Sequence, residues 1–229
     1  MSLGAPRAHF RRTDSTNERA RAFAARGAPH GTLVTADEQT AGRGRQGRSW
    51  VAPPHAALLC SLLLRDPPAL LPLLAGVAVA RTVADSAQVK WPNDILLRGR
   101  KVAGILVEGR LQDGWAVLGV GINVAVRPED LPAELRGRAG GLGLTSQEVE
   151  PTLNRLLVQL EHWLSRPAAE VLGDLRGRDA LLGRRVRWAG GAGLAAGVDE
   201  AGRLRVRTAT GPVALESGEV HLEGIYPES

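Results

Sequence analysis

The feature that most constrains the fold is a pair of consecutive apolar segments in the first half of the chain. Residues 56–64 have the length and continuity of a buried strand, and residues 68–84 predict an apolar helix that packs into a core. The most hydrophobic stretch, residues 69–80, contains Pro72 and is shorter than the ~20 residues that cross a bilayer. The N-terminus lacks the apolar core of a signal peptide. We therefore expect a soluble protein, not a membrane protein, built from both sheet and helix.

Turn residues divide the rest of the first 182 residues into short elements. Residues 14–27 predict a helix in which Ser15 and Glu18 have the spacing of a capping box. Residues 32–36 predict a strand, and residues 89–126 alternate short strands with turns, as in an antiparallel meander. The Pro-, Gly- and Arg-rich residues 127–146 predict a mobile loop, residues 152–165 a helix, and Ala168 the start of another.

The composition changes after Leu182. Five short strand candidates separated by glycine turns follow in fewer than fifty residues, which suggests a small β-barrel. The predicted fold is thus α+β: a mixed or antiparallel sheet with packed helices in residues 1–182, and a small β-barrel domain in residues 183–229.

Charge and cysteine content narrow the classes of function. The chain has 29 basic and 24 acidic residues, a balance that suits anionic small molecules, an acidic protein or a nucleic acid. Only two of the basic residues are lysines, Lys90 and Lys101, so these two positions are candidates for a role that requires a compact ammonium. The single cysteine, Cys60, excludes internal disulfides, fits a reducing cytoplasm, and lies in an apolar run that favours a buried thiol over a nucleophile.

The strongest local feature is the arginine loop, residues 41–50. Its three glycines let backbone N–H groups approach a ligand closely, and its three arginines supply permanent positive charge, which together favour an anion site. It is not a P-loop, because the Lys-Ser/Thr ending is absent. The alternatives are a solvated loop or an RGG-like nucleic-acid segment, but such segments recur with aromatic residues between them.

Scarce residue types gather in a few other segments. Lys90-Trp-Pro-Asn-Asp94, Arg100-Lys-Val-Ala-Gly-Ile-Leu-Val-Glu108 and Gly119-Val-Gly-Ile-Asn123 contain both lysines and two of the four asparagines, and a third asparagine, Asn17, follows Ser15-Thr16. Each segment alone is better explained as a strand with a turn, or as a glycine-bearing strand fitted against a neighbour. Their concentration of rare polar residues predicts one shared site.

In this order, these segments together resemble the biotin protein ligase family. The resemblance extends from about Thr13 to Tyr226, and residues 197–202 and 217–220 are similar to the family's small SH3-like barrel. It implies the class II synthetase-like fold of biotin and lipoate ligases. It also implies that ATP and biotin, with Mg²⁺, form biotinyl-5′-adenylate and pyrophosphate, after which biotin passes to a lysine of the biotin carboxyl carrier protein of acetyl-CoA carboxylase or a related carboxylase.

The resemblance also implies roles for individual residues. Lys101, Arg45 and Asp94 are the candidate catalytic residues, and Asp94 is also the candidate Mg²⁺ ligand. The candidate biotin-binding residues are Ser15, Thr16, Asn17, Gln39, Gly42, Arg43, Gly44, Arg45, Lys101 and Gly104. The candidate nucleotide-binding residues are Arg43, Arg45, Arg48, Trp50, Lys90, Asn93 and Asn123.

Several alternatives remain at this stage. A lipoate ligase or octanoyl transferase of similar fold is the nearest rival, and a nucleic-acid-binding module finds little support because the chain has only two Phe and one Tyr. The hydroxyl of Ser15 is a candidate helix cap as well as a candidate ligand contact. Because the first predicted helix begins within fifteen residues of Met1, we expect no DNA-binding domain. The five histidines show no zinc spacing, and a homodimer remains open.

Overall fold

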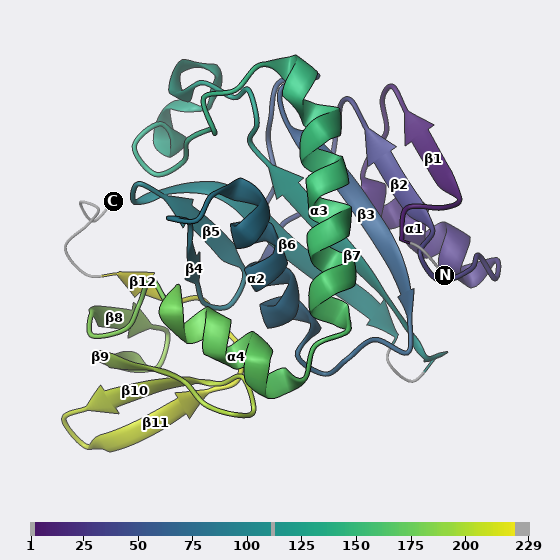
Figure 1. Ribbon diagram of the computed structural model, residues 1–229. Helices are drawn as coiled ribbons and strands as arrows, with labels where there is room; N and C mark the ends of the chain where they lie inside the picture. Colours follow the sequence, from purple (N-terminus) through teal and green to yellow (C-terminus); the bar gives the residue numbers. More distant parts are fainter. Residues whose placement is uncertain (1–2, 111–112, 223–229) are drawn as a thin grey trace.

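A seven-stranded mixed sheet lies at the centre of the structure, a computed structural model that describes residues 3–110 and 113–222 (Figure 1). The strand order is β1-β2-β3-β7-β6-β5-β4, and only β1 and β2 are paired in parallel. The strands are β1 (Arg7–Phe10), β2 (Leu33–Ala36), β3 (Leu58–Arg65), β4 (Gln88–Lys90), β5 (Asp94–Leu97), β6 (Arg100–Arg110) and β7 (Trp115–Ile122).

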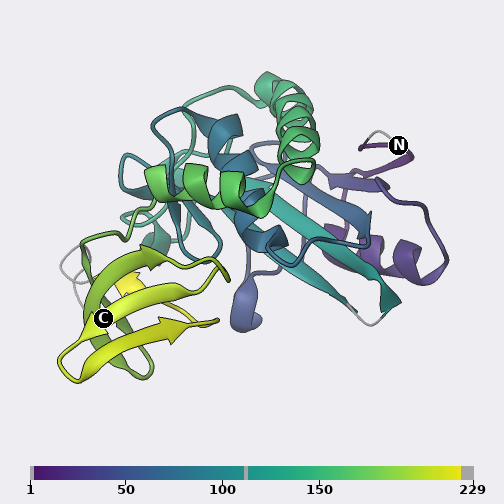
Figure 2. The same cartoon turned by 60° about the horizontal axis from the view of Figure 1, so that its bottom comes forward.

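Helices cover both faces of this sheet, which explains why β3 is apolar at nearly all of its positions. Alternate side chains of a strand point to opposite faces, so a strand covered on both sides has no solvent-exposed position. Leu62 and Leu64 belong to the main core, on the side of α2 (Leu71–Val83) and α3 (Val149–Leu164). Leu63 packs with Ala20 and Ala24 of α1 (Thr16–Ala25), which lies on the other face (Figures 1 and 2).

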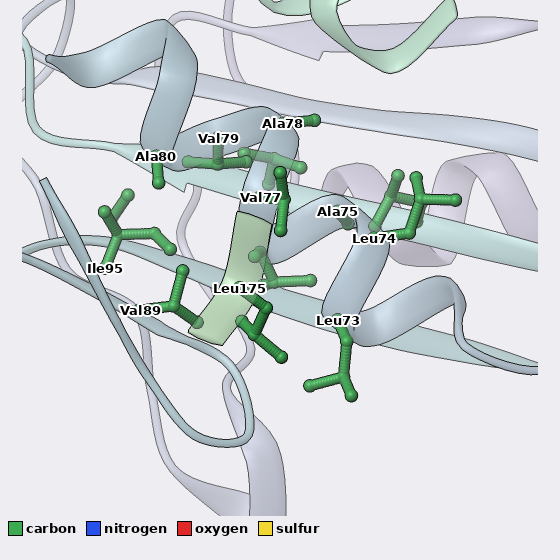
Figure 3. Close-up of a cluster of buried hydrophobic side chains, with 14 of the residues drawn as sticks. Leu73, Leu74, Ala75, Val77, Ala78, Val79, Ala80, Val89, Ile95 and Leu175 are labelled. Atoms are coloured by element: carbon green, nitrogen blue, oxygen red, sulfur yellow. The ribbon is translucent and has the colours of Figure 1, made fainter. Parts of the chain in front are cut away.

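The helix α2 is the centre of the main core. Its residues 73–80 are nearly all buried, as expected for a helix that is apolar on every side. Figure 3 shows its side chains beside Val89 of β4, Ile95 of β5 and Leu175 of α4 (Ala168–Gly177). The predicted core-packed helix is therefore confirmed, and the packing fixes the β4–β5 turn against α2.

The C-terminal residues form a second, antiparallel sheet. Its strand order is β11-β10-β9-β8-β12, with β8 (Arg185–Trp188), β9 (Gly191–Val198), β10 (Leu204–Thr208), β11 (Gly211–Leu215) and β12 (His221–Leu222). Five strands were predicted here and five are found, but the described residues do not confirm the predicted barrel, because β11 and β12 lie at opposite edges of an open sheet. Closure requires hydrogen bonds between these edges, which a strand pattern in the sequence cannot reveal.

Most other expected elements are confirmed, with three differences. The strand β1 was missed because it has only four residues, and its apolar face, Ala8 and Phe10, is only half-buried. Residues 127–146, predicted as a loop, contain the 3-10 helices η3 (Pro128–Asp130) and η4 (Ala133–Leu135), and a further one, η5 (Ser146–Glu148), begins at Ser146. The capping box at Ser15 is absent, since its side chain makes no capping hydrogen bond. Among the described residues, no helix has the length and apolarity needed to span a membrane.

Candidate active site

One cavity lies where the sheet, α1, the arginine loop and the C-terminal sheet meet. Its lining includes strand residues of β6 and β7, the turn after β4, and Gly218, Glu219 and Val220 from the segment before β12. Five cationic side chains but only two carboxylates line it, so the cavity favours anionic ligands. The cations are Arg43, Arg45, Arg48, Lys90 and Lys101, and the carboxylates are Asp94 and Glu219.

A hydrogen-bonded polar wall, made of Thr16, Asn17, Gln39 and Ser61, closes one end of the site. Gln39 Oε1 accepts hydrogen bonds from the backbone N–H of Thr16 at 2.7 Å and from its hydroxyl at 3.0 Å. The Ser61 hydroxyl lies 2.8 Å from Thr16 Oγ1 and donates to Asn17 Oδ1 at 2.6 Å. These contacts fix the amide orientations and leave a buried, polar surface suited to a ligand with both donors and acceptors.

The sequence analysis missed Ser61, although the sequence contains a signal that could have found it. It is fully buried in β3, where it is the polar exception in an otherwise apolar run. A buried hydroxyl requires a hydrogen-bond partner. The strand alternation places Ser61 on the α1 face with Leu63, opposite Thr16 and Asn17.

The indole of Trp50 packs on the floor of the site, against two glycines of adjacent strands. A Cβ at Gly121 would lie 2.5 Å from the indole, and one at Gly104 would lie 2.9 Å from it, so only glycine permits this approach. Gly104 and Gly121 face each other in the β6–β7 register. The Trp50 Nε1–H is buried and has no hydrogen-bond partner among the residues that the structure describes. A buried donor without a partner is unfavourable. A ligand that brings a hydrogen-bond acceptor would therefore favour a shift of the indole toward it.

Both lysines of the chain face one carboxylate. Lys101 Nζ lies 2.6 Å from Asp94 Oδ1, and Lys90 Nζ lies 4.0 Å from Asp94 Oδ2. The ammonium of Lys101 also lies 5.7 Å from the Trp50 ring centroid. Burial lowers the pKa of Lys90, and the nearby positive charge of Lys101 adds to this, although Asp94 opposes it. The two scarce lysines are thus brought together, as the sequence predicted.

Each arginine of the loop has a different protein partner. Arg43 pairs with Glu18 of α1, and with Glu108 of β6 at 2.9 Å. The Nη1 of Arg45 donates to Asn93 Oδ1 at 3.1 Å. Arg48 pairs with Glu219, beside the C-terminal sheet. The loop is therefore held by side chains from four separate parts of the chain.

Comparison with known proteins shows the family to which the chain belongs. A sequence model of the biotin/lipoate A/B protein ligase family matches residues 9–124, slightly more than half of the 229 residues. This chain belongs to that family. Its matched region contains the polar wall, the arginine loop, both lysines and the Gly104–Gly121 floor.

Relatives within the biotin/lipoate ligase family share the fold and much of the sequence. The biotin--[acetyl-CoA-carboxylase] ligase of Mycobacterium tuberculosis is 37% identical over an alignment covering 91% of this chain and 85% of the relative. The bifunctional ligase/repressor BirA of Bacillus subtilis is 41% identical, but the chain spans only 45% of its length. The Aquifex aeolicus biotin protein ligase, solved in complex with biotin and ATP, has a TM-score of 0.82 at 29% identity and covers 96% of this chain and 99% of its own.

Thirteen of the sixteen predicted site residues of this biotin/lipoate ligase line the cavity. They are Ser15, Thr16, Gln39, Arg43, Gly44, Arg45, Arg48, Trp50, Lys90, Asn93, Asp94, Lys101 and Gly104. Asn17 lies in the polar wall behind them, and Gly42 packs against the Trp50 backbone. Asn123 is buried apart from the lining and donates through Nδ2 to the Gly140 carbonyl at 2.9 Å. Its role in nucleotide binding stays a prediction.

Among the other lining residues, which were not predicted as functional, two carry ionisable side chains. Glu219 comes from a part of the chain whose sequence shows only strands and turns, so nothing in the pattern links it to the arginine loop. Cys60 lies among the lining residues, but complete burial raises the pKa of its thiol to about 12. Its thiol is therefore not ionised near neutral pH, in agreement with the expected core role.

Proposed function

We propose that this chain is an ATP-dependent biotin protein ligase. The observation that carries the proposal is the meeting of Lys101, Arg45 and the polar wall in one cavity of a family member. The relative from Mycobacterium tuberculosis is named a biotin--[acetyl-CoA-carboxylase] ligase, and the Aquifex aeolicus ligase was solved with biotin and ATP. A lipoate-specific activity is less favoured, because the relatives with high coverage are biotin ligases.

The first step joins two anions. An oxygen of the biotin carboxylate attacks the α-phosphorus of ATP, the bond to the bridging oxygen breaks, and pyrophosphate leaves. Lys101 is assigned to the biotin carboxylate and the α-phosphate. Arg45, from the arginine loop, is assigned to the same two anionic groups. Asp94, which lies 2.6 Å from Lys101 Nζ, holds that ammonium in place. The two cations thus cancel the repulsion between the reactants.

The polar wall and the loop are assigned to the two ends of the reactants. Ser15, Thr16 and Gln39 face biotin's ureido ring, with Asn17 behind them, because donors and acceptors are both available there. Gly42, Arg43 and Gly44 shape the loop over the valerate chain. Trp50, which covers Gly104 on the floor, is assigned to adenine, and Arg48, Lys90, Asn93 and Asn123 to the nucleotide.

A resident Mg²⁺ at Asp94 does not fit these residues. Both oxygens of Asp94 already face ammonium groups, Lys101 at 2.6 Å and Lys90 at 4.0 Å, which repel a cation. Within the described ranges, no group of three or more His, Cys, Asp or Glu side chains could hold a metal ion. We therefore assign no step to a protein-bound Mg²⁺.

In the second step, the amine of a carrier lysine attacks the biotinyl carbonyl of the adenylate, and AMP leaves. The carrier we propose is the biotin carboxyl carrier protein of acetyl-CoA carboxylase or a related carboxylase, as the names of the relatives suggest. The free, buried Cys60 supports action in the reducing cytoplasm. We retain the interpretation of residues 183–229 as a separate small β domain that supplies Glu219 to the site.

Exchange of radiolabelled pyrophosphate into ATP tests the first step. We expect exchange that depends on biotin and is at least about a hundredfold slower with lipoate, because a site that hydrogen-bonds a polar ring rejects a ligand that lacks it. The second step is tested by transfer of labelled biotin to a purified carrier domain, with its lysine-to-arginine variant as the control. Exchange supported by lipoate alone would refute the proposal.

A further inference from the structure

Glu108, the last residue of the segment that contains Lys101, joins two parts of the site. Its Oε2 accepts a hydrogen bond from Asn17 Nδ2 at 2.8 Å, and its Oε1 lies 2.9 Å from the guanidinium of Arg43. Its side chain is only 18% exposed. A carboxylate in this position is partly desolvated, so both contacts are stronger than they would be on an open surface.

Arg43 is held between two carboxylates. Glu18 of α1 pairs with it on the exposed side, where the side chains are 36% and 42% exposed, and Glu108 pairs with it from β6. The fork of the guanidinium can serve two such partners at once. Glu18 is shared with Arg21, whose Nη1 lies 3.1 Å from it. Through Glu18 and Glu108, Arg43 ties the arginine loop to α1 and to β6.

The side-chain oxygen of Asn17 contacts two other strands of the sheet, β3 and β7. Its Oδ1 accepts from Ser61 at 2.6 Å, and a Cβ at Gly119 would lie 2.1 Å from this oxygen. The amide thus has its oxygen toward Ser61 and its nitrogen toward Glu108. Loss of the Glu108 carboxylate would remove the shorter of two hydrogen bonds from the amide nitrogen, whose other acceptor is the Leu106 carbonyl at 3.4 Å.

We propose that Glu108 is a positioning residue that couples closure of the arginine loop to the orientation of Asn17, and thereby to binding of the biotin ring. The inference rests on the proposed function, which assigns the polar wall to that ring. Glu108 binds no substrate. It holds two groups that do not touch each other, one from the loop and one from the wall, in a single arrangement.

Glu108→Gln and Glu18→Gln are the matched pair of variants. Each removes one carboxylate from Arg43, but only the change at position 108 also disturbs Asn17, because the new amide must satisfy Asn17 and would turn its NH₂ group toward Arg43. Two quantities are measured: the Kd for biotin without ATP, by calorimetry, and the rate at which trypsin cleaves after loop arginines without substrates. We expect both variants to speed cleavage, and only Glu108→Gln to weaken biotin binding, by about tenfold.

Double variants test the coupling itself. Arg43→Gln and Asn17→Ser are combined, and the loss of biotin affinity is compared with the product of the separate losses. We expect a departure of about threefold or more from that product with Glu108 present, and simple multiplication when Glu108→Gln is added. Circular dichroism checks folding. If Glu108→Gln does not fold, the Arg43–Asn17 cycle decides alone, and independent losses overturn the inference.

Equal biotin affinities for Glu108→Gln and Glu18→Gln also overturn it, because Glu108 would then serve only to neutralise Arg43. Failure of the proposed function gives a different result. In that case the wild-type protein neither binds biotin nor exchanges pyrophosphate, whereas the trypsin comparison, which needs no substrate, still reports whether the two carboxylates hold the loop.

Discussion

At the scale of single residues, the two lysines differ in how closely each pairs with Asp94, and therefore in their effect on catalysis and on stability. Both face Asp94, but Lys101 Nζ lies 2.6 Å from Oδ1 of this carboxylate, whereas Lys90 Nζ lies 4.0 Å from Oδ2. Desolvation lowers the pKa of Lys90. Lys101 is thus a preorganised cation, and Lys90 is a charge kept in the cavity at the expense of stability.

Replacement of Lys101 by Ala should slow adenylate formation about 100- to 1,000-fold, since a preorganised charge on the transferring groups is lost. Biotin-dependent pyrophosphate exchange measures this, and circular dichroism should show an unchanged fold. Arg26→Ala, an exposed change at the end of α1, is the control and should exchange normally. Near-normal exchange in Lys101→Ala would remove this residue from the mechanism.

Replacement of Lys90 by Met should raise the free energy of unfolding by about 1 kcal/mol at pH 7 and slow exchange, because burying a charge is unfavourable. Since the pKa of Lys90 is lowered in the folded state, the folded protein binds fewer protons than the unfolded one between that lowered pKa and the ordinary value. The gain should therefore shrink as pH rises through this window. Denaturant unfolding from pH 7 to 10 measures it, and a gain that grows with pH would contradict the assignment.

At the scale of elements, the arginine loop and the β6–β7 pair fit each other through Trp50. The indole lies where side chains at Gly104 and Gly121 would otherwise be, so the loop can close only over glycine. When the arginine loop closes over a reactive adenylate, it excludes water, and this is the function we expect of the loop.

Gly121→Ala should displace Trp50 and hasten loss of the adenylate about tenfold, because the new Cβ would lie 2.5 Å from the indole. Release of labelled adenylate, followed without a carrier, measures this lifetime. Gly137→Ala, where no atom lies within 4 Å of the new Cβ, is the matched control. An unchanged lifetime in Gly121→Ala would mean that the loop does not cover the product.

At the scale of the whole molecule, the C-terminal sheet is part of the site rather than an appendage. Its core residues, such as Val186 and Leu204, belong to the same hydrophobic cluster as α2, and Trp91 Nε1 donates to the Gly202 carbonyl at 3.0 Å. Desolvation raises the pKa of Glu219, but hydrogen bonding and charge from Arg48, aided by His221 and Lys90, bring it below its usual value. The carboxylate is thus ionised and holds the arginine loop.

Glu219→Gln should therefore slow pyrophosphate exchange about tenfold without unfolding either sheet, since a charge-assisted contact to Arg48 is lost. Glu216→Gln is the matched control, because Glu216 is 80% exposed and lies 4.0 Å from Arg203. Equal activities of the two variants would show that the C-terminal sheet does not govern the loop.

The sequence by itself predicted most of the local elements and thirteen of the residues that line the cavity. Continuous apolar runs predicted β3 and α2, because a segment buried on both sides has few polar positions, and the rare lysines and asparagines marked the segments that meet. Ser61 was predictable in principle as a lone polar residue in a buried strand.

Only the tertiary structure decided which groups touch. The pairs Arg43–Glu108 and Arg48–Glu219 join residues 65 and 171 positions apart, and such contacts depend on strand order and on the packing of the two sheets rather than on any local pattern. The open C-terminal sheet, the missing cap at Ser15 and the position of Asn123 outside the cavity lining have the same cause. Hydrogen bonds between distant segments form only after the hydrophobic core has placed them within reach.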